Sequence, residues 1–336
     1  MTNKNDLPPD ESKASPLDYP IDESSAGRLR GFGKAVRELV FKRKNEDPIQ
    51  EIGDTVPQRE TITEDWDDVR AEIENDPLLE DMPDDIRHEA VELTYELYKA
   101  AREKVAPVIT GFADSLLQEA GGRQIVFAAR DGLGAYHAAN ILKKKFDYGN
   151  EDPEQLVYAY LTRTIVYDTP PATLREYLEQ VGVHDVDANV VLADIGMYGT
   201  ILPGVRNVLP NMEPRYLISK TSEVPGYADG QSSRMTSTDT VMGNPAVHFL
   251  EDTFSGPIPS PKSLIHSSAE LEPDTVNESF PLEEMLKRKY ALQAIQDYTA
   301  NLDARPMQPA TEAIRNLDLL LTDTSAYEHL MVSHTR

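Results

Sequence analysis

The feature that most constrains the fold of this 336-residue chain is a strand-like run that ends in a glycine loop. Residues 190–195 are apolar except for Asp194, and residues 201–209 can form a helix. Between them lie Gly196, Gly199 and Thr200. An unbroken apolar run is typical of a buried parallel strand. The loop after such a strand directs backbone N–H groups and the positive end of a helix dipole at a ligand, whereas the alternative is an ordinary turn whose glycines serve packing.

A second unit of the same kind lies earlier in the chain. Residues 125–129 form a short apolar run, and a predicted helix covers residues 136–145. The loop between them contains Arg130, Asp131 and Gly132. Further predicted elements are strands over 157–161 and 215–219 and a helix over 172–181. Strands that alternate with helices predict a parallel α/β sheet, so both glycine loops are expected at its carboxyl edge, where ligands bind in such sheets.

Composition narrows the class of protein. The formal net charge is −25, from 58 Asp and Glu against 33 Lys and Arg. So acidic a surface repels polyanions, which argues against general nucleic-acid binding and resembles proteins of high-salt cytoplasm. The absence of cysteine excludes disulfides, thiolate zinc sites and cysteine nucleophiles. No apolar run approaches the roughly 18–20 residues of a membrane span, and the polar start does not match a secretory signal, so a cytoplasmic protein is expected.

The order of these patterns predicts four parts. Residues 1–60 are expected to be a disordered acidic tail, because Pro, Asp, Glu and Ser dominate it. Residues 61–120 are predicted to be helical, residues 121–265 to form the α/β core, and residues 266–336 to form C-terminal helices. Within the core, residues 221–240 are rich in Ser, Thr, Gly and Asp and are expected to form a loop or lid.

The tail contains one basic amphipathic island at residues 28–44, with seven basic residues against a single Glu38. Such a segment can bind an anionic membrane or a partner protein peripherally. It can equally dock on the chain's own acidic body, which the charge balance favours. Both alternatives remain open at this point.

The helical parts show clear start and stop signals. A helix is expected to contain Trp66 and Ile73, and another to begin at Pro83 and to be interrupted by Pro107. The next helix, over residues 108–120, is expected to stop at two glycines. Near the C-terminus, apolar spacing predicts helices over residues 281–302 and 311–321.

The two glycine loops resemble those of the type I phosphoribosyltransferase fold. In that family an Arg-x-Gly loop grips diphosphate, and an acidic-acidic-x-x-x-Thr-Gly-x-Thr loop holds ribose 5-phosphate. Here Arg130 and Gly132 match the first loop, and Asp194, Gly199 and Thr200 match the second. The resemblance covers about residues 122–220 and implies a parallel-sheet, Rossmann-type core. It also implies binding of a phosphorylated sugar or nucleotide, transfer of a glycosyl or phosphoribosyl group, and Mg²⁺ as a cofactor.

A second resemblance covers four motifs in order. It is to an uncharacterised segment that follows the hydrolase part of predicted haloacid-dehalogenase-class hydrolases linked to surface-polysaccharide genes. The shared motifs are Ala-Arg-Asp-Gly at 129–132, Thr-Arg at 162–163, Asp-Ile-Gly-x-x-Gly-Thr at 194–200, and Leu-Glu-x-x-Phe-Ser-x-Pro at 250–257. The hydrolase's own Asp-x-Asp nucleophile motif is absent, so phosphatase activity is not implied. The resemblance implies a shared site.

The proposed site residues have definite roles in this interpretation. Amides of residues 196–200 and the Thr200 hydroxyl would hold a phosphate, and Arg130 and Arg163 would clamp a diphosphate. Asp194 would accept hydrogen bonds from sugar hydroxyls or bind Mg²⁺. Asp131 would repel diphosphate unless Mg²⁺ or an arginine lies between them. Glu251 is a spare carboxylate for acid–base chemistry.

Each residue also has a structural alternative. Arg130 and Asp131 can form a surface turn, and Arg163 can pair with Asp131 or Asp194 as an ion pair. For Tyr198 and Glu251 the structural interpretation is favoured, and His137 and His248 are assigned no role. Ala193 stands where the phosphoribosyltransferase motif has its first acidic residue. This departure favours the alternative function, a non-catalytic descendant of the fold that binds a ligand or a protein.

Overall fold

The structure is a computed structural model. It describes residues 66–80, 82–129, 131–149, 155–197, 199–219, 261–267, 270–274, 282–305 and 309–322, all within the unit Ile49–Arg336. The predictions for residues 1–60, for the island 28–44 and for the loop 221–240 lie outside the described residues. The same holds for Arg130, Tyr198 and Glu251.

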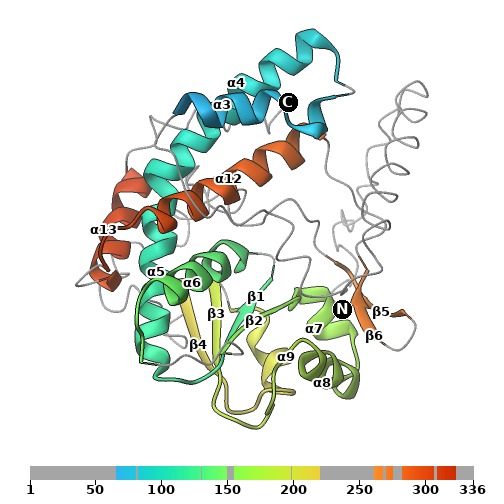
Figure 1. Ribbon diagram of the computed structural model, residues 1–336. Coiled ribbons are helices and arrows are strands. Elements are labelled where there is room, and N and C mark those ends of the chain that lie inside the picture. The colour runs from blue at the N-terminus through green and yellow to red at the C-terminus, as the bar shows by residue number, and fades with distance from the viewer. Residues whose placement is uncertain are drawn as a thin grey trace, which may run out of the picture. The chain divides into compact units, whose positions relative to one another are not determined.

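Four parallel strands form a sheet in the order β2–β1–β3–β4 (Figure 1). The strands are β1 Ile125–Ala128, β2 Leu156–Ala159, β3 Val191–Met197 and β4 Glu213–Ser219. β1 is central, since Ile125 pairs with Leu156 on one side and with Val191 on the other. The sheet confirms the predicted α/β class.

Both faces of the sheet are buried, which explains the unbroken apolar runs. Side chains alternate between faces along a strand, so Ile125 and Phe127 belong to one core cluster while Val126 and Ala128 belong to another. The first cluster includes residues of α5 (Ala106–Ala120) and α6 (Leu133–Lys145), and the second includes α8 (Pro171–Gln180) and α9 (Leu202–Arg206). Each fully buried Val, Leu, Ile or Phe side chain contributes roughly 1.5–3 kcal/mol of transfer free energy.

The connections place a topological switch point between β1 and β3. The chain leaves β1 through α6 to reach β2 on one side. It then returns through α7 (Arg163–Asp168) and α8 to β3 on the other side of β1, and continues outward through α9 to β4. Ligands of open α/β sheets bind in the crevice at such a point, outside the carboxyl ends of the strands.

A group of helices packs beside the sheet, and helix α12 contacts both the rest of this group and the helices that cover the sheet. This helical part contains α3 (Trp66–Glu74), the short 3-10 helix η1 (Pro77–Leu79), α4 (Asp84–Ala100), α12 (Leu282–Ala300) and α13 (Pro309–Thr322). Helix α12 packs against α4, α5 and α6. Buried hydrogen bonds that fix it include those from Tyr98 Oη to Asp297 Oδ2 at 2.6 Å and between the Thr110 and Thr299 hydroxyls at 2.7 Å. None of the described helices combines the length and the apolarity needed to cross a bilayer.

The predicted interruption at Pro107 is wrong, because the helical path continues from α4 into α5. A single π-helical segment, η2 (Ala101–Val105), joins them, and the N–H of Ala106 donates to the carbonyl of Ala101, five residues earlier. Pro107 lies in the first turn of α5. A proline ring clashes with the carbonyl four residues before it in a regular α-helix, and the wider π turn relieves that clash. The predicted stop is confirmed, since Gly121 caps α5 in the left-handed conformation with φ of 59°.

An antiparallel hairpin that the sequence did not predict packs beside α8. It consists of β5 (Leu264–Ser267) and β6 (Glu270–Pro273). The Gln180 side-chain amide donates to the Leu271 carbonyl at 3.0 Å and accepts from the Leu271 N–H at 2.8 Å. The Pro261 carbonyl, just before the hairpin, accepts a hydrogen bond from the Thr162 hydroxyl at 3.0 Å. The chain after residue 260 is therefore tied to the end of β2.

Candidate functional site

The two glycine loops lie at the same edge of the sheet, on either side of the switch point. β1 and β3 are parallel neighbours, with Ile125 opposite Val191, so the loops after Ala128 and after Met197 follow the same ends of adjacent strands. The loop after β2, which carries Thr162 and Arg163, leaves from this edge as well. Three loops with predicted ligand residues therefore meet at one edge, which is the arrangement expected of a binding site in an open sheet.

The first loop turns tightly from β1 into α6. The N–H of Gly132 donates to the Ala128 carbonyl at 2.9 Å, and the Gly132 carbonyl accepts from Tyr136 N–H at 2.9 Å. A Cβ at Gly132 would lie 2.5 Å from the Ala128 carbonyl oxygen. Glycine is thus required by the turn itself. Asp131 is half-buried beside it.

Replacing Gly132 by alanine should lower the free energy of unfolding by about 1–3 kcal/mol, because the new Cβ meets backbone that cannot move aside. Urea unfolding followed by circular dichroism measures this loss. The matched control is Gly149→Ala, a glycine at φ of 71° with no atom within 4 Å of an added Cβ, which should lose only about 1 kcal/mol from left-handed strain. A Gly132→Ala protein as stable as wild type would contradict the steric explanation.

The second loop differs in two ways from the sequence prediction. β3 runs to Met197 and pairs Gly196 with Ile218, so Gly196 belongs to the sheet ladder and the loop is shorter than predicted. The following helix α9 has only five residues, against the nine predicted. Because so short a helix has a weak macrodipole, an anion at this loop would have to be held mainly by side-chain charge. Gly199 has φ of 62°, a left-handed conformation that favours glycine.

Thr200 is the point where two of the loops meet. Arg163 Nη2 donates to the Thr200 hydroxyl at 3.2 Å, and Tyr167 Oη donates to the Thr200 carbonyl at 2.6 Å. Arg163 and Tyr167 are one helical turn apart on α7, so they project from the same face of that helix. The structure therefore brings together Arg163 and Thr200, two of the predicted ligand residues.

Helix α7 was not predicted from the sequence, although its N-cap is a local contact. Thr162 caps it, with its hydroxyl accepting from the Ile165 N–H at 3.2 Å. Gly204 of α9 lets the two helices approach, since a Cβ there would collide with the Val166 side chain. Tyr167 is a site residue that sequence reasoning missed. Its position four residues after Arg163 is the signal that could have found it, given the helix.

Asp194 lies beside Tyr216 on the sheet. The two are paired in register between β3 and β4, and Asp194 alternates with Ala193 so that it shares the face of Leu192 and Tyr216. Asp194 is half-buried, whereas Tyr216 is fully buried. Burial, with the nearby charge of Asp194, raises the pKa of the Tyr216 hydroxyl. Tyr216 therefore remains a neutral phenol beside Asp194.

For Arg163 and Asp194 the sequence suggests two arrangements, an ion pair of the arginine and a bound Mg²⁺ ion at the aspartate. Among the described residues, Arg163 forms no ion pair with Asp131 or Asp194. The Arg163 guanidinium donates to the Thr200 hydroxyl instead. In the described part of the chain, no group of three or more His, Cys, Asp or Glu side chains is placed so that it could hold a metal ion.

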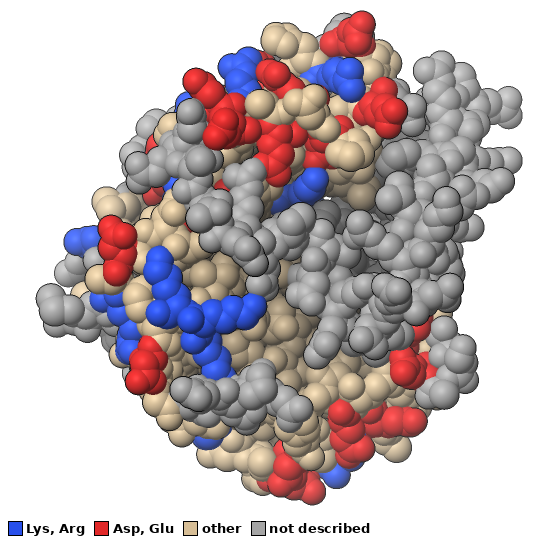
Figure 2. All heavy atoms as spheres, in the orientation of Figure 1, with Lys and Arg blue, Asp and Glu red and all other residues tan. Residues whose placement is uncertain are grey.

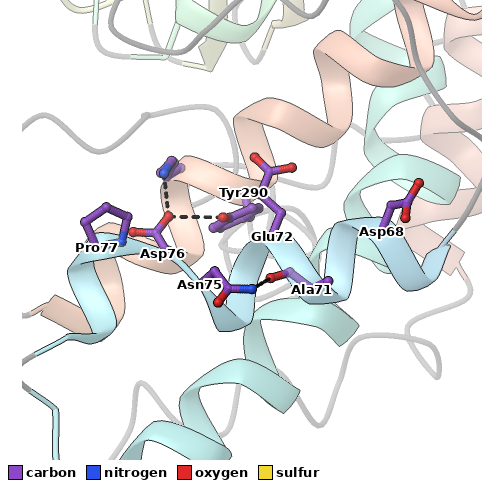
Figure 3. Close-up of a pocket in the computed structure, with 8 residues that line it drawn as sticks. Asp68, Ala71, Glu72, Asn75, Asp76, Pro77 and Tyr290 are labelled. Atoms are coloured by element: carbon purple, nitrogen blue, oxygen red, sulfur yellow. Dashed lines mark hydrogen bonds and ion pairs between the residues drawn. The ribbon is translucent and has the colours of Figure 1, made fainter.

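A separate cleft of about 580 Å³ lies in the helical part (Figure 3). Its lining comes from α3, η1 and α12 and includes Asp68, Glu72, Asp76 and Lys289. Figure 2 shows the acidic side chains that gather over α3 and α4. Asp76 is buried and accepts from the Tyr290 hydroxyl at 3.0 Å and from Lys289, so it is engaged by the fold. Arg163 and Thr200, for which the sequence predicts ligand contacts, lie instead at the sheet edge.

No protein-family model matches the chain, and a search of curated proteins finds no match to it.

Proposed function

We propose that the carboxyl edge of the sheet binds the phosphate of a phosphorylated sugar or nucleotide. The observation that carries this proposal is the contact of Arg163 with Thr200 at the Gly199 loop, beside the switch point. A guanidinium, a hydroxyl and a glycine loop are a chemically suitable set for a phosphate. The resemblance to phosphoribosyltransferase loops points to the same class of ligand.

Arg163 supplies the positive charge that the short helix α9 cannot. It is exposed, and its bond to Thr200 uses one of the five N–H donors of a guanidinium. The remaining donors suit the bidentate grip of a phosphate. The Thr200 hydroxyl can donate to the same phosphate while it accepts from Arg163. Arg130, outside the described residues, is the second arginine proposed for a diphosphate.

Asp194 is proposed to bind the sugar. As a half-buried carboxylate in β3, three residues before the strand ends at Met197, it would accept hydrogen bonds from the ribose hydroxyls. Asp131 adds a second negative charge at the adjacent loop. Mg²⁺, bound by Asp194 together with ligand phosphates, would reduce the repulsion between these carboxylates and a diphosphate.

Group transfer is the further proposal for this site. Departure of diphosphate from a phosphoribosyl donor leaves an oxocarbenium-like centre, which a carboxylate such as Asp194 stabilises. The second candidate is binding without transfer, and one observation favours it. Ala193, at the position of the missing acidic residue, is fully buried in the core cluster shared with α5 and α6. A charged side chain there would be costly, so this chain would rely on a single carboxylate in β3, Asp194.

Binding is tested by thermal shift and calorimetry at high and low salt. The probes are phosphoribosyl diphosphate with Mg²⁺, ribose 5-phosphate and nucleoside monophosphates. A ligand at one hundred times its Kd should stabilise wild type by about 2.7 kcal/mol. Arg163→Ala should weaken binding roughly tenfold or more, because it removes charge-assisted hydrogen bonds. Asp194→Asn should abolish the ligand shift while the ligand-free melting temperature stays close to that of wild type.

The matched control is Arg175→Ala, an exposed arginine of α8 that pairs with Asp187 at 3.4 Å. It should leave ligand affinity unchanged. If no probe raises the melting temperature of wild type, the proposed function is wrong. If a probe binds and neither Arg163→Ala nor Asp194→Asn weakens it, the site lies elsewhere. Release of diphosphate with an acceptor present separates transfer from binding alone.

A further inference from the structure

We propose that Tyr167 is a stacking platform for an aromatic base, so that the ligand of the sheet-edge site is a nucleotide. This inference rests on the proposed function. It narrows the ligand from a phosphorylated sugar or a nucleotide to a nucleotide. Sugar phosphates and nucleotides share a phosphate, and only nucleotides have a flat base to place on a ring.

Tyr167 is an exposed aromatic residue at the edge of the proposed site. Its side chain is 52 % exposed, and it is the one aromatic among the large hydrophobic side chains that stand out as exposed in the described part of the chain. A buried aromatic ring stabilises the fold through packing. An exposed ring at the edge of a binding site instead offers apolar area on which a ligand can stack.

The ring is nevertheless held in place. Its hydroxyl donates to the Thr200 carbonyl at 2.6 Å, and a Cβ at Gly204 would lie 3.4 Å from its Cε1. One edge of the ring therefore rests against α9 while the hydroxyl is tethered to the β3 loop. A ring fixed before binding loses little side-chain entropy when a base stacks on it.

The ring of Tyr167 lies close to the residues that are proposed to hold the phosphate. Tyr167 and Arg163 are neighbours on one face of α7, and side chains one turn apart have Cβ atoms about 5–6 Å from each other. Both contact Thr200. A phosphate at Arg163 and Thr200 and a base at Tyr167 are thus separated by a span that a single ribose can bridge.

A structural role for Tyr167 makes different predictions. If its hydroxyl only braces the Thr200 loop, loss of the hydroxyl matters and loss of the ring face does not. Tyr167→Phe removes the hydroxyl and keeps the ring, while Tyr167→Leu removes the ring and keeps apolar bulk. The two variants separate stacking from bracing.

The experiment measures the affinity of wild type, Tyr167→Phe and Tyr167→Leu for AMP, UMP and ribose 5-phosphate by calorimetry. Stacking predicts that Tyr167→Leu weakens AMP binding roughly tenfold and leaves ribose 5-phosphate unchanged, with Tyr167→Phe close to wild type. It also predicts, in wild type alone, that AMP binds more tightly than UMP and ribose 5-phosphate, because a purine stacks more strongly. This second readout stands if Tyr167→Leu does not fold.

Two results would overturn the proposal. One is equal weakening of AMP and ribose 5-phosphate by Tyr167→Leu, and the other is wild-type affinity for ribose 5-phosphate equal to that for AMP. Failure of the proposed function has its own signature, since wild type would then bind none of the three probes.

Discussion

Replacing Asp76 by alanine is expected to lower the free energy of unfolding by about 2–4 kcal/mol, because a buried carboxylate with three donors is removed while the lysine left behind is only partly buried. Asp76 is 4 % exposed and accepts from the Leu78 N–H at 2.9 Å, the Tyr290 hydroxyl at 3.0 Å and the Lys289 ammonium (Figure 3). One carboxylate thus caps η1 and fixes α12 to it. Without it, the buried Tyr290 hydroxyl and the half-buried ammonium lose their acceptor.

Urea unfolding of Asp76→Ala, Asp76→Asn and Lys289→Met separates these contributions. The asparagine should lose less than the alanine, because its carbonyl still caps η1 and accepts from Tyr290. The matched control is Asp68→Ala, an exposed carboxylate of the same cleft, which should stay within about 0.5 kcal/mol of wild type. An alanine variant that unfolds at the wild-type urea concentration would show that the α12 contact depends on apolar packing alone.

His137 should make the protein less stable as the pH falls from about 6.5 to about 4. Burial lowers the pKa of His137 to about 4, and the side chain is 3 % exposed. In this interval the unfolded chain binds a proton that the folded protein excludes, so stability rises with pH and is fully present above the unfolded pKa. A shift of this size corresponds to about 3 kcal/mol between the two limits.

The variant His137→Leu isolates this effect, because leucine keeps the bulk and cannot titrate. The free energy of unfolding of wild type minus that of the variant should fall as pH decreases through this interval. The pKa of Glu213, lowered first by its hydrogen bond to Arg123, also ties stability to pH, but it does so in both proteins and cancels in the difference. A difference that does not change with pH would mean that His137 is protonated in the folded state.

The sequence alone was enough to predict the parallel sheet and the shared edge of its two glycine loops. Unbroken apolar runs such as 125–128 require burial on both faces of the sheet. Because the strands are parallel, the loops that follow them must lie at the same, carboxyl edge. Helix α12 and the stop at Gly121 followed from spacing and from glycine chemistry in the same way. These features depend on local pattern.

Features that depend on distant contacts were not predicted. Residues 163–168 are too short to show a periodic pattern, so α7 and the exposure of Tyr167 emerge only when Gly204 of α9 packs against Val166. The end of β3 was placed too early because a glycine usually signals a turn, whereas pairing with Ile218 keeps Gly196 extended. The path through Pro107 required a π turn, which has no sequence signature of its own.

The contact of α7 with Thr200 has a mechanical consequence. Strand β2 is a four-residue strand with β1 as its sheet neighbour, and a strand that short should fray readily. Yet the segment that leaves it is fastened, through Thr200, to the end of β3 two positions away. Local opening of β2 is therefore expected to release the loop after β3 as well. A contact that holds this loop in place would also slow hydrogen exchange in β2.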